Sequence, residues 1–83
     1  MTIYVDEAVN PWRGHMWAHL VSDESIEELQ RFGDSIGLKR HWLQTNHYNI
    51  TARKRNWAIK LGAVPLPRRD LAHLVFEKYR RLT

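Results

Sequence analysis

The segment from Met16 to Leu38 constrains the fold more than any other part of the chain. Its first six residues, MWAHLV, favour β-structure and predict a strand over 16–21. Ser25 followed by Glu28 is a capping-box pattern, and apolar residues then recur at helical spacing until Gly37 ends the helix. A strand that leads directly into a capped amphipathic helix is typical of α/β domains.

The rest of the chain repeats this alternation in short segments. Apolar runs predict further strands over 3–5, 41–44 and 64–66, and helical patterns predict helices over 51–61 and from Pro67 onward. The predicted order is β–β–α–β–α–β–α. Because strands separated by helices favour parallel neighbours, we predict a single α/β domain over residues 1–83 with a short, mostly parallel sheet. The first strand, which only a loop joins to the second, is expected to be antiparallel or at an edge.

Charge is divided unevenly along the chain. Residues 1–36 hold seven acidic and two basic side chains, whereas residues 37–83 hold eleven basic and two acidic ones, and the total is +4. A basic surface of this kind attracts phosphate-bearing partners. The alternative is that the acidic half of the chain packs beside the basic half and neutralises it.

The composition excludes several classes of protein. Without cysteine there is no disulfide framework and no thiol chemistry. No apolar run approaches the roughly 20 residues of a membrane-spanning helix, and the first residues, MTIYVD, do not resemble a signal peptide. We therefore expect a cytoplasmic protein without membrane contact. Gly-rich phosphate loops, HExxH and nucleophile-elbow motifs are also absent.

Polar residues follow each of the three strands that are expected to be parallel. Because the carboxyl ends of parallel strands meet at one edge, where ligands bind, we expect these residues to converge there. Helix N-termini at this edge would add N–H donors for an anion. His47 and Asp23 form the predicted catalytic pair, an imidazole oriented by a carboxylate. The predicted phosphate-binding residues are Asn46, Tyr48, Arg53, Arg55, Arg68 and Arg69.

A metal site is a different use of the histidines. His15 and His19 are four residues apart in a predicted strand, which separates them by about 13 Å, too far to share one ion. Asp6, His19, Asp23 and His47 could still converge in three dimensions. No metal-binding spacing is present, so we predict no metal and no cofactor.

The four tryptophans are expected to serve two purposes. Trp17, Trp42 and Trp57 are predicted to pack in the core, as large aromatic side chains usually do. Trp12 lies in a segment punctuated by proline and glycine, and it is the better candidate for an exposed contact.

Several motifs together resemble a known family. The segments WAHLVSD at 17–23, WLQ at 42–44 and HYNI at 47–50, with Gly62-Ala63, are similar to those of domain-of-unknown-function family 4031, found in bacteria and phages. The resemblance covers residues 3–64 and implies no established activity. The family usually has His-Tyr-Asp where this chain has His47-Tyr48-Asn49. The chain therefore lacks a carboxylate that could serve as a base or metal ligand at position 49.

Three functions stay open. The leading hypothesis is a small basic bacterial or phage protein that binds a phosphate-bearing ligand, such as nucleic acid or a nucleotide. The first alternative is a hydrolase or transferase that acts on phosphoesters with His47 and Asp23. The second alternative is a protein that binds a host protein and inhibits or modulates it. The sequence leaves open whether the chain is an enzyme.

Overall fold

The computed structural model describes residues 2–82, and the side chains of residues 2–75. Strands and helices alternate along this part of the chain. The elements are β1 (Ile3–Val5), β2 (Asn10–Trp12), β3 (His15–Ser22), α1 (Ile26–Ser35), the 3₁₀ turn η1 (Arg40–Trp42), β4 (Tyr48–Thr51), α2 (Ala52–Lys60), β5 (Val64–Pro65) and α3 (Arg68–Leu82).

The sheet is mixed, and β3 is its central strand. β2 and β1 pair antiparallel with successive parts of β3, β4 also pairs antiparallel with β3, and β5 runs parallel to β1. The predicted α/β class is confirmed, but the prediction of a mostly parallel sheet is wrong. The strand expected over 41–44 is absent, because residues 40–42 form η1. The chain reverses again in a tight turn at Thr45 and Asn46 before it enters β4, and this extra reversal makes β4 antiparallel to β3.

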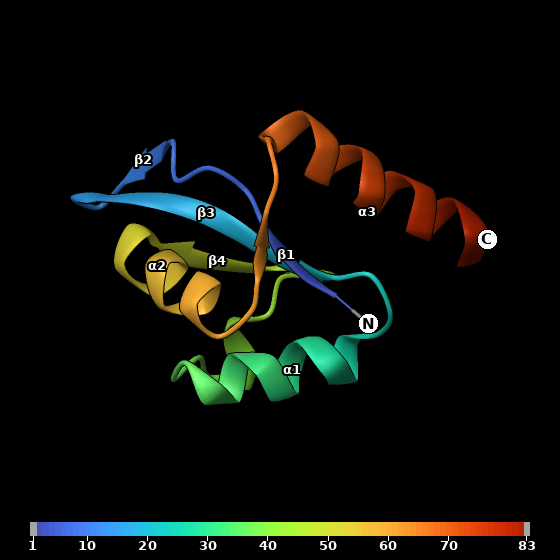
Figure 1. Cartoon of the computed structure of the whole chain (residues 1–83), viewed down its shortest axis with the longest axis horizontal. Coiled ribbons are helices and arrows are strands. Elements are labelled where there is room, and N and C mark those ends of the chain that lie inside the picture. The colour runs from blue at the N-terminus through green and yellow to red at the C-terminus, as the bar shows by residue number, and fades with distance from the viewer. Residues whose placement is uncertain (1, 83) are drawn as a thin grey trace.

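A hairpin replaces the loop that was expected before β3. β2 and β3 are joined by the two-residue turn of Arg13 and Gly14, whose φ angles are 49° and 77°. Two consecutive positive φ values fit the twist of a tight hairpin. Pro11 is tolerated in β2 because an edge strand can omit one ladder hydrogen bond. The hairpin projects beyond the rest of the sheet (Figure 1).

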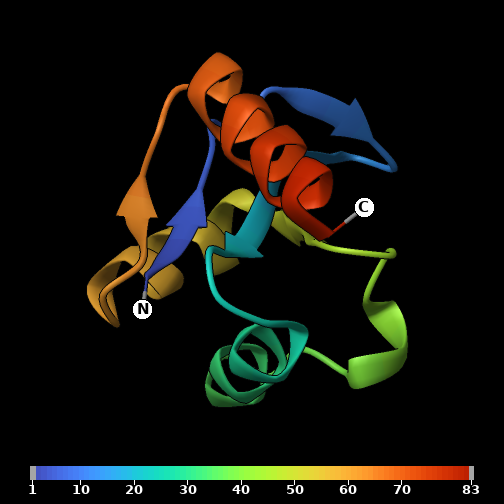
Figure 2. The same cartoon turned by 90° about the vertical axis from the view of Figure 1, so that its right-hand side faces the viewer.

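Helices cover the two faces of the sheet unequally. α1 and α2 lie on one side of the sheet and α3 lies on the other (Figures 1 and 2). On the side of α1 and α2, Ala18, Leu20, Tyr48 and Ile50 are buried in the core. Because side chains alternate along a strand, the residues between them face the side of α3. On that face, Val21 near the end of β3 is buried. The side chains become more exposed toward the start of β3, where the hairpin lies.

Local signals set the ends of α1 as predicted. The Oγ atom of Ser25 accepts a hydrogen bond from the N–H of Glu28 at 3.1 Å, and Gly37 follows the helix with φ 76°. The second half of the capping box is altered. The carboxylate of Glu28 accepts from Ser22 Oγ, and the N–H of Ser25 donates to the same Oγ. Ser22 and Ser25 therefore organise the start of α1 together.

We expect Ser25→Ala to lower the free energy of unfolding by about 1 kcal/mol, because the helix loses its N-cap acceptor. Ser35→Ala, at the exposed end of the same helix, is the matched control and should change it by less than about 0.5 kcal/mol. Chemical denaturation followed by circular dichroism measures both. Equal effects of the two substitutions would contradict the assigned cap.

The prediction of buried tryptophans is wrong for two of the three. Trp42 is 41% exposed and Trp57 is 47% exposed, whereas Trp17 is half-buried. In α2 the buried residue is Ala58, whose small side chain permits close approach to the sheet and turns the neighbouring Trp57 outward. Trp12 is 59% exposed, as predicted.

Candidate functional site

A buried carboxylate and a partly exposed imidazole meet on the α3 face of the sheet. Asp6 directly follows β1 and is fully buried, and His19 lies on the neighbouring strand β3 with a side chain that is 28% exposed. Asp6 Oδ2 accepts from His19 Nδ1 at 2.7 Å, and Asp6 Oδ1 accepts from the backbone N–H of His19 at 2.6 Å. Because a carboxylate oxygen accepts, the hydrogen of this contact is on Nδ1, which leaves Nε2 as the nitrogen that can exchange a proton with a ligand.

His47 lies beside His19, and these two residues are called the imidazole pair. Their ring centroids are 5.2 Å apart and their planes are inclined by 72°. A tight turn positions His47: the N–H of Gln44 donates to the carbonyl of His47 at 2.8 Å, and Thr45 has φ 52°. His47 Nδ1 lies 2.9 Å from Asn46 Oδ1, so Nδ1 donates and Nε2 keeps its lone pair.

The environment of His47 keeps its ring neutral. Burial lowers the pKa of His47 below its ordinary value of 6.5, and the charge that His19 can carry lowers this pKa further. A hydrogen bond with Asn49 and the charge of Asp6 act in the opposite direction but are smaller. Near pH 7, His47 can therefore accept a proton.

NMR titration should show that the pKa of His47 lies below 6.5 and rises in His19→Ala, which removes a neighbouring charge. Because the pKa is lower in the folded than in the unfolded chain, the associated stability is fully present above about pH 6.5. It is lost as the pH falls from there through the folded pKa. His41→Ala, at an exposed histidine, is the control. A His47 pKa above 6.5 would contradict the burial of the ring.

Two of the predicted phosphate-binding residues contact this cluster. Asn46 binds the ring of His47, and the Nε–H of Arg55 donates to the backbone carbonyl of Asp6 at 2.6 Å. Arg55 is half-buried and reaches β1 from α2. The structure therefore places a guanidinium beside the residue that holds His19.

The other predicted phosphate-binding residues lie farther out or point elsewhere. Arg53 is exposed in the first turn of α2. Arg68 and Arg69 are exposed at the start of α3, which follows β5 at the same end of β1 as Asp6. Tyr48 is fully buried in the core on the side of α1 and α2, where burial raises the pKa of its phenol, and so it does not face the imidazole pair.

The carboxylate of Asp23, the predicted partner of His47, binds the backbone at the start of β1. It accepts from the N–H of Thr2 at 2.9 Å, whereas Asp6 follows the end of β1. Thr2 and Asp6 are four residues apart along an extended segment, a separation of about 13 Å. Because β3 ends where β1 begins, Asp23, which follows β3, lies away from Asp6, which follows β1.

The carboxylate that contacts an imidazole is therefore Asp6, which the sequence indicated only as one of four residues that could converge on a metal. One local signal was present. His19 lies between Ala18 and Leu20, which must face the core, so its ring must face the other side of the sheet. What the sequence did not provide was the register that sets Asp6 beside it.

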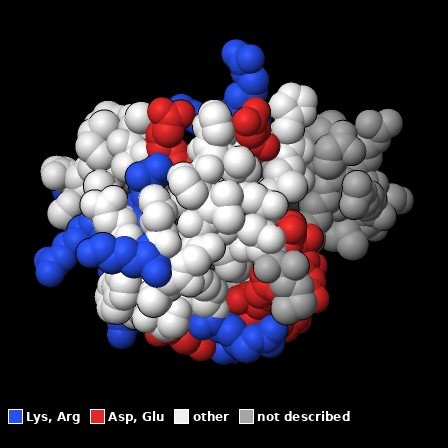
Figure 3. Space-filling view, viewed as in Figure 1, with Lys and Arg blue, Asp and Glu red and all other residues white. Residues whose placement is uncertain are grey.

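Acidic and basic side chains are interspersed over the surface, with some local grouping. On the face shown in Figure 3, acidic side chains gather beside the start of α1 and basic side chains project over α2. Among the described side chains, the ion pair that joins the two halves of the chain is that of Arg40 with Asp34, at 2.9 Å. Lys54 and Arg55 instead donate to backbone carbonyls. Mutual neutralisation of the halves is therefore partial among the described residues.

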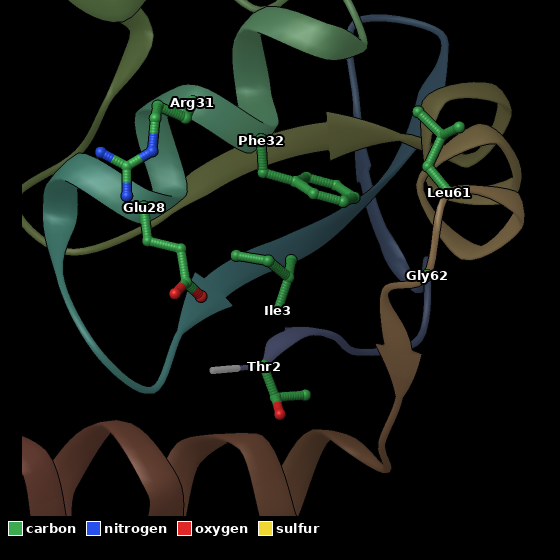
Figure 4. A pocket seen from close by; sticks show the side chains of 7 residues that line it. All are labelled: Thr2, Ile3, Glu28, Arg31, Phe32, Leu61 and Gly62. Atoms are coloured by element: carbon green, nitrogen blue, oxygen red, sulfur yellow. The ribbon is translucent and has the colours of Figure 1, made fainter.

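A shallow pocket of about 420 Å³ lies near α1, and no predicted site residue lines it. The Glu28 carboxylate extends from α1 toward Ile3 at its wall, and Glu24 beside it has its pKa raised by hydrogen bonding to Glu28. Figure 4 shows this pocket, which neither His19 nor His47 lines. Its lining residues are Thr2, Ile3, Glu28, Arg31, Phe32, Leu61 and Gly62.

The described residues hold neither a group of metal ligands nor a membrane-spanning helix. No three His, Cys, Asp or Glu side chains in this part of the chain are arranged to hold a metal ion. No helix there is both long and apolar enough to cross a membrane.

Comparison with protein families identifies what the chain is related to. The model of the family described as Protein of unknown function (DUF4031) matches residues 3–78. The chain belongs to the DUF4031 family. No curated protein and no solved structure matches it. The match to DUF4031 includes every predicted site residue and both members of the imidazole pair, and it confirms the resemblance found in the sequence.

Proposed function

We propose that this DUF4031 protein hydrolyses or transfers a phosphoester of a nucleotide or nucleic acid by general acid–base catalysis at the imidazole pair. The observation that supports this proposal is the contact between a fully buried carboxylate, Asp6, and the Nδ1 atom of His19, beside a second imidazole. General acid–base catalysis commonly uses an imidazole of this kind. A carboxylate orients the ring through one nitrogen, and the other nitrogen exchanges a proton with the substrate.

The two imidazoles are suited to opposite proton transfers. His47, which burial keeps neutral, can take a proton from water or from a hydroxyl group as that oxygen attacks phosphorus. His19 in its protonated form can give its Nε2 proton to the leaving oxygen, and Asp6 compensates the positive charge that the ring carries before the transfer. Bonding to phosphorus passes from the leaving oxygen to the attacking oxygen, and the pair is restored by proton exchange with water.

Basic side chains at the end of β1 where Asp6 lies favour a phosphate-bearing ligand. Arg55 lies against Asp6, and Arg68 and Arg69 are exposed at the start of α3, at the same end of β1. These cations support the second candidate function, binding of a phosphate-bearing ligand without turnover. We also propose a cytoplasmic location, where such ligands are abundant.

A turnover assay tests the proposal. The wild-type protein is incubated with bis(4-nitrophenyl) phosphate, 4-nitrophenyl phosphate and a set of cyclic and linear dinucleotides between pH 5 and pH 9. We expect release of product from at least one diester, with a bell-shaped pH profile that reports one acid and one base. Folded protein that binds a nucleotide but releases no product from any of these esters supports the second candidate and overturns the first.

A further inference from the structure

Aromatic rings form a stripe along the open part of the α3 face. His15, Trp17 and His19 alternate along β3 and so share this face, and Trp12 faces it from β2 because it pairs with His15. The rings contact one another edge to face: Trp12 and Trp17 have centroids 5.9 Å apart, and His15 and Trp17 have centroids 6.0 Å apart. We call Trp12, His15 and Trp17 the ring stripe, and it leads directly to the imidazole pair.

Hydrogen bonds fix the ring stripe in place. The indole N–H of Trp17 donates to the backbone carbonyl of Trp12 at 2.8 Å, and the side-chain amide of Asn10 donates to the carbonyl of Trp17 at 3.3 Å. The two-residue turn of Arg13 and Gly14 sets the hairpin geometry. Rings that are already ordered lose little conformational entropy when a ligand stacks on them.

Two members of the ring stripe are exposed and the third, Trp17, is half-buried. Trp12 is 59% exposed and His15 is exposed, whereas Val21, farther along the same face of β3, is only 2% exposed. α3 lies over the end of β3 and leaves the hairpin uncovered (Figures 1 and 2). An ordered tryptophan that the fold leaves in water is available for contact with a ligand.

A positive charge beside the ring stripe favours a ligand that carries phosphate groups. The guanidinium carbon of Arg13 lies 4.6 Å from the centroid of Trp12, so a cation and an aromatic ring are presented together at the tip of the hairpin. Proteins that bind single-stranded nucleic acid combine cations for the backbone with aromatic rings on which unpaired bases stack. Paired bases do not offer their faces, so a duplex fits this surface less well.

We infer that the substrate of the imidazole pair is a single-stranded nucleic acid whose bases stack on Trp12 and Trp17. This inference rests on the proposed function and names its substrate class. Trp17 and His19 are two residues apart on one strand, a distance of about 6.6 Å, which is comparable to the step between consecutive nucleotides of an extended strand. A base on the ring stripe therefore places the next phosphate near the imidazole pair.

Binding of labelled oligonucleotides tests the inference. Fluorescence anisotropy is measured with 12-nucleotide oligo(U) and oligo(dT) on the His47→Ala protein, in which the proposed turnover is blocked. Adding Trp12→Ala should weaken binding about 10- to 100-fold, the range expected when one stacking ring is removed. Adding Trp57→Ala is the matched control, because Trp57 is 47% exposed on α2, across the sheet, and it should change affinity less than twofold. Circular dichroism confirms that each variant is folded.

The remaining outcomes are also decisive. Affinity that falls with added salt supports a nucleic-acid backbone in contact with cations, and affinity that does not change with salt overturns the inference. Equal loss with Trp12→Ala and Trp57→Ala, or no binding of either oligonucleotide, overturns it too. If neither oligonucleotide binds, turnover of small phosphoesters by the wild-type protein would still support the proposed function. Oligonucleotide binding through Trp12 without turnover of any ester would overturn the proposed function and leave the stacking surface.

Discussion

Replacing His47 with alanine should lower kcat for the phosphoester about 10²- to 10⁴-fold, the usual contribution of one general acid or base. The physical reason is that the neutral His47 ring is the proposed proton acceptor, and alanine cannot replace it. Because the ring is only half-buried, the protein should stay folded. Initial rates at saturating substrate, with thermal unfolding measured in parallel, check both statements.

His41→Ala is the matched control for this experiment. His41 is an exposed histidine in η1, so its removal changes the composition equally and should leave kcat within about twofold of the wild-type value. A His47→Ala protein that keeps wild-type kcat would remove His47 from the mechanism. Equal losses for the two variants would point to a change in the fold instead.

Asp6→Ala should lower the free energy of unfolding by about 2–4 kcal/mol, the range for removing one partner of a buried, hydrogen-bonded pair. Asp6 is fully buried and accepts from both the ring and the backbone N–H of His19, so its loss leaves two donors without their acceptor. In a domain of this size the melting temperature should fall by roughly 10–20 °C. Calorimetry or denaturant unfolding measures the change.

Two further variants show whether the destabilisation comes from the burial of Asp6 or from the loss of a charge. Asp34→Ala removes an exposed carboxylate that pairs with Arg40, and it should cost no more than about 1 kcal/mol. Asp6→Asn keeps the size of the side chain and an oxygen for the backbone N–H, so it should destabilise less than Asp6→Ala. If Asp6→Ala and Asp34→Ala cost the same, Asp6 does not hold the sheet face together.

Much of the helical structure could be predicted from neighbouring residues. Ser25 and Gly37 set the ends of α1, and Thr51 caps α2 by accepting from the N–H of Lys54 at 3.4 Å. Caps and positive-φ glycines act within a few residues, so the sequence contains the whole signal. The residues of α2 that face the sheet were predicted less well. Ala58 and Trp57 are neighbours in the sequence, so a small rotation of the helix about its axis decides which of them faces the sheet.

The candidate site could be predicted only in part. His47 and Arg55 were found because they lie in a polar, basic segment between β-like and helical patterns. Asp23 was assigned as the partner of His47 on the assumption that the strands are parallel, and the antiparallel pairing of β1 with β3 instead sets Asp6 beside His19. The hairpin that orders Trp12 was also missed, because Arg13 is an unusual residue at positive φ.

The sequence by itself determined the α/β class, the family, the helix ends and the uneven division of charge, since each depends on composition or on short spacings. Only the tertiary structure decided which side chains meet. Asp6 and His19 are thirteen residues apart and Asp6 and Arg55 are forty-nine apart, and their contacts depend on strand register and direction. Register is a property of the assembled sheet, where burying one face fixes how the strands align, and no single segment carries that information.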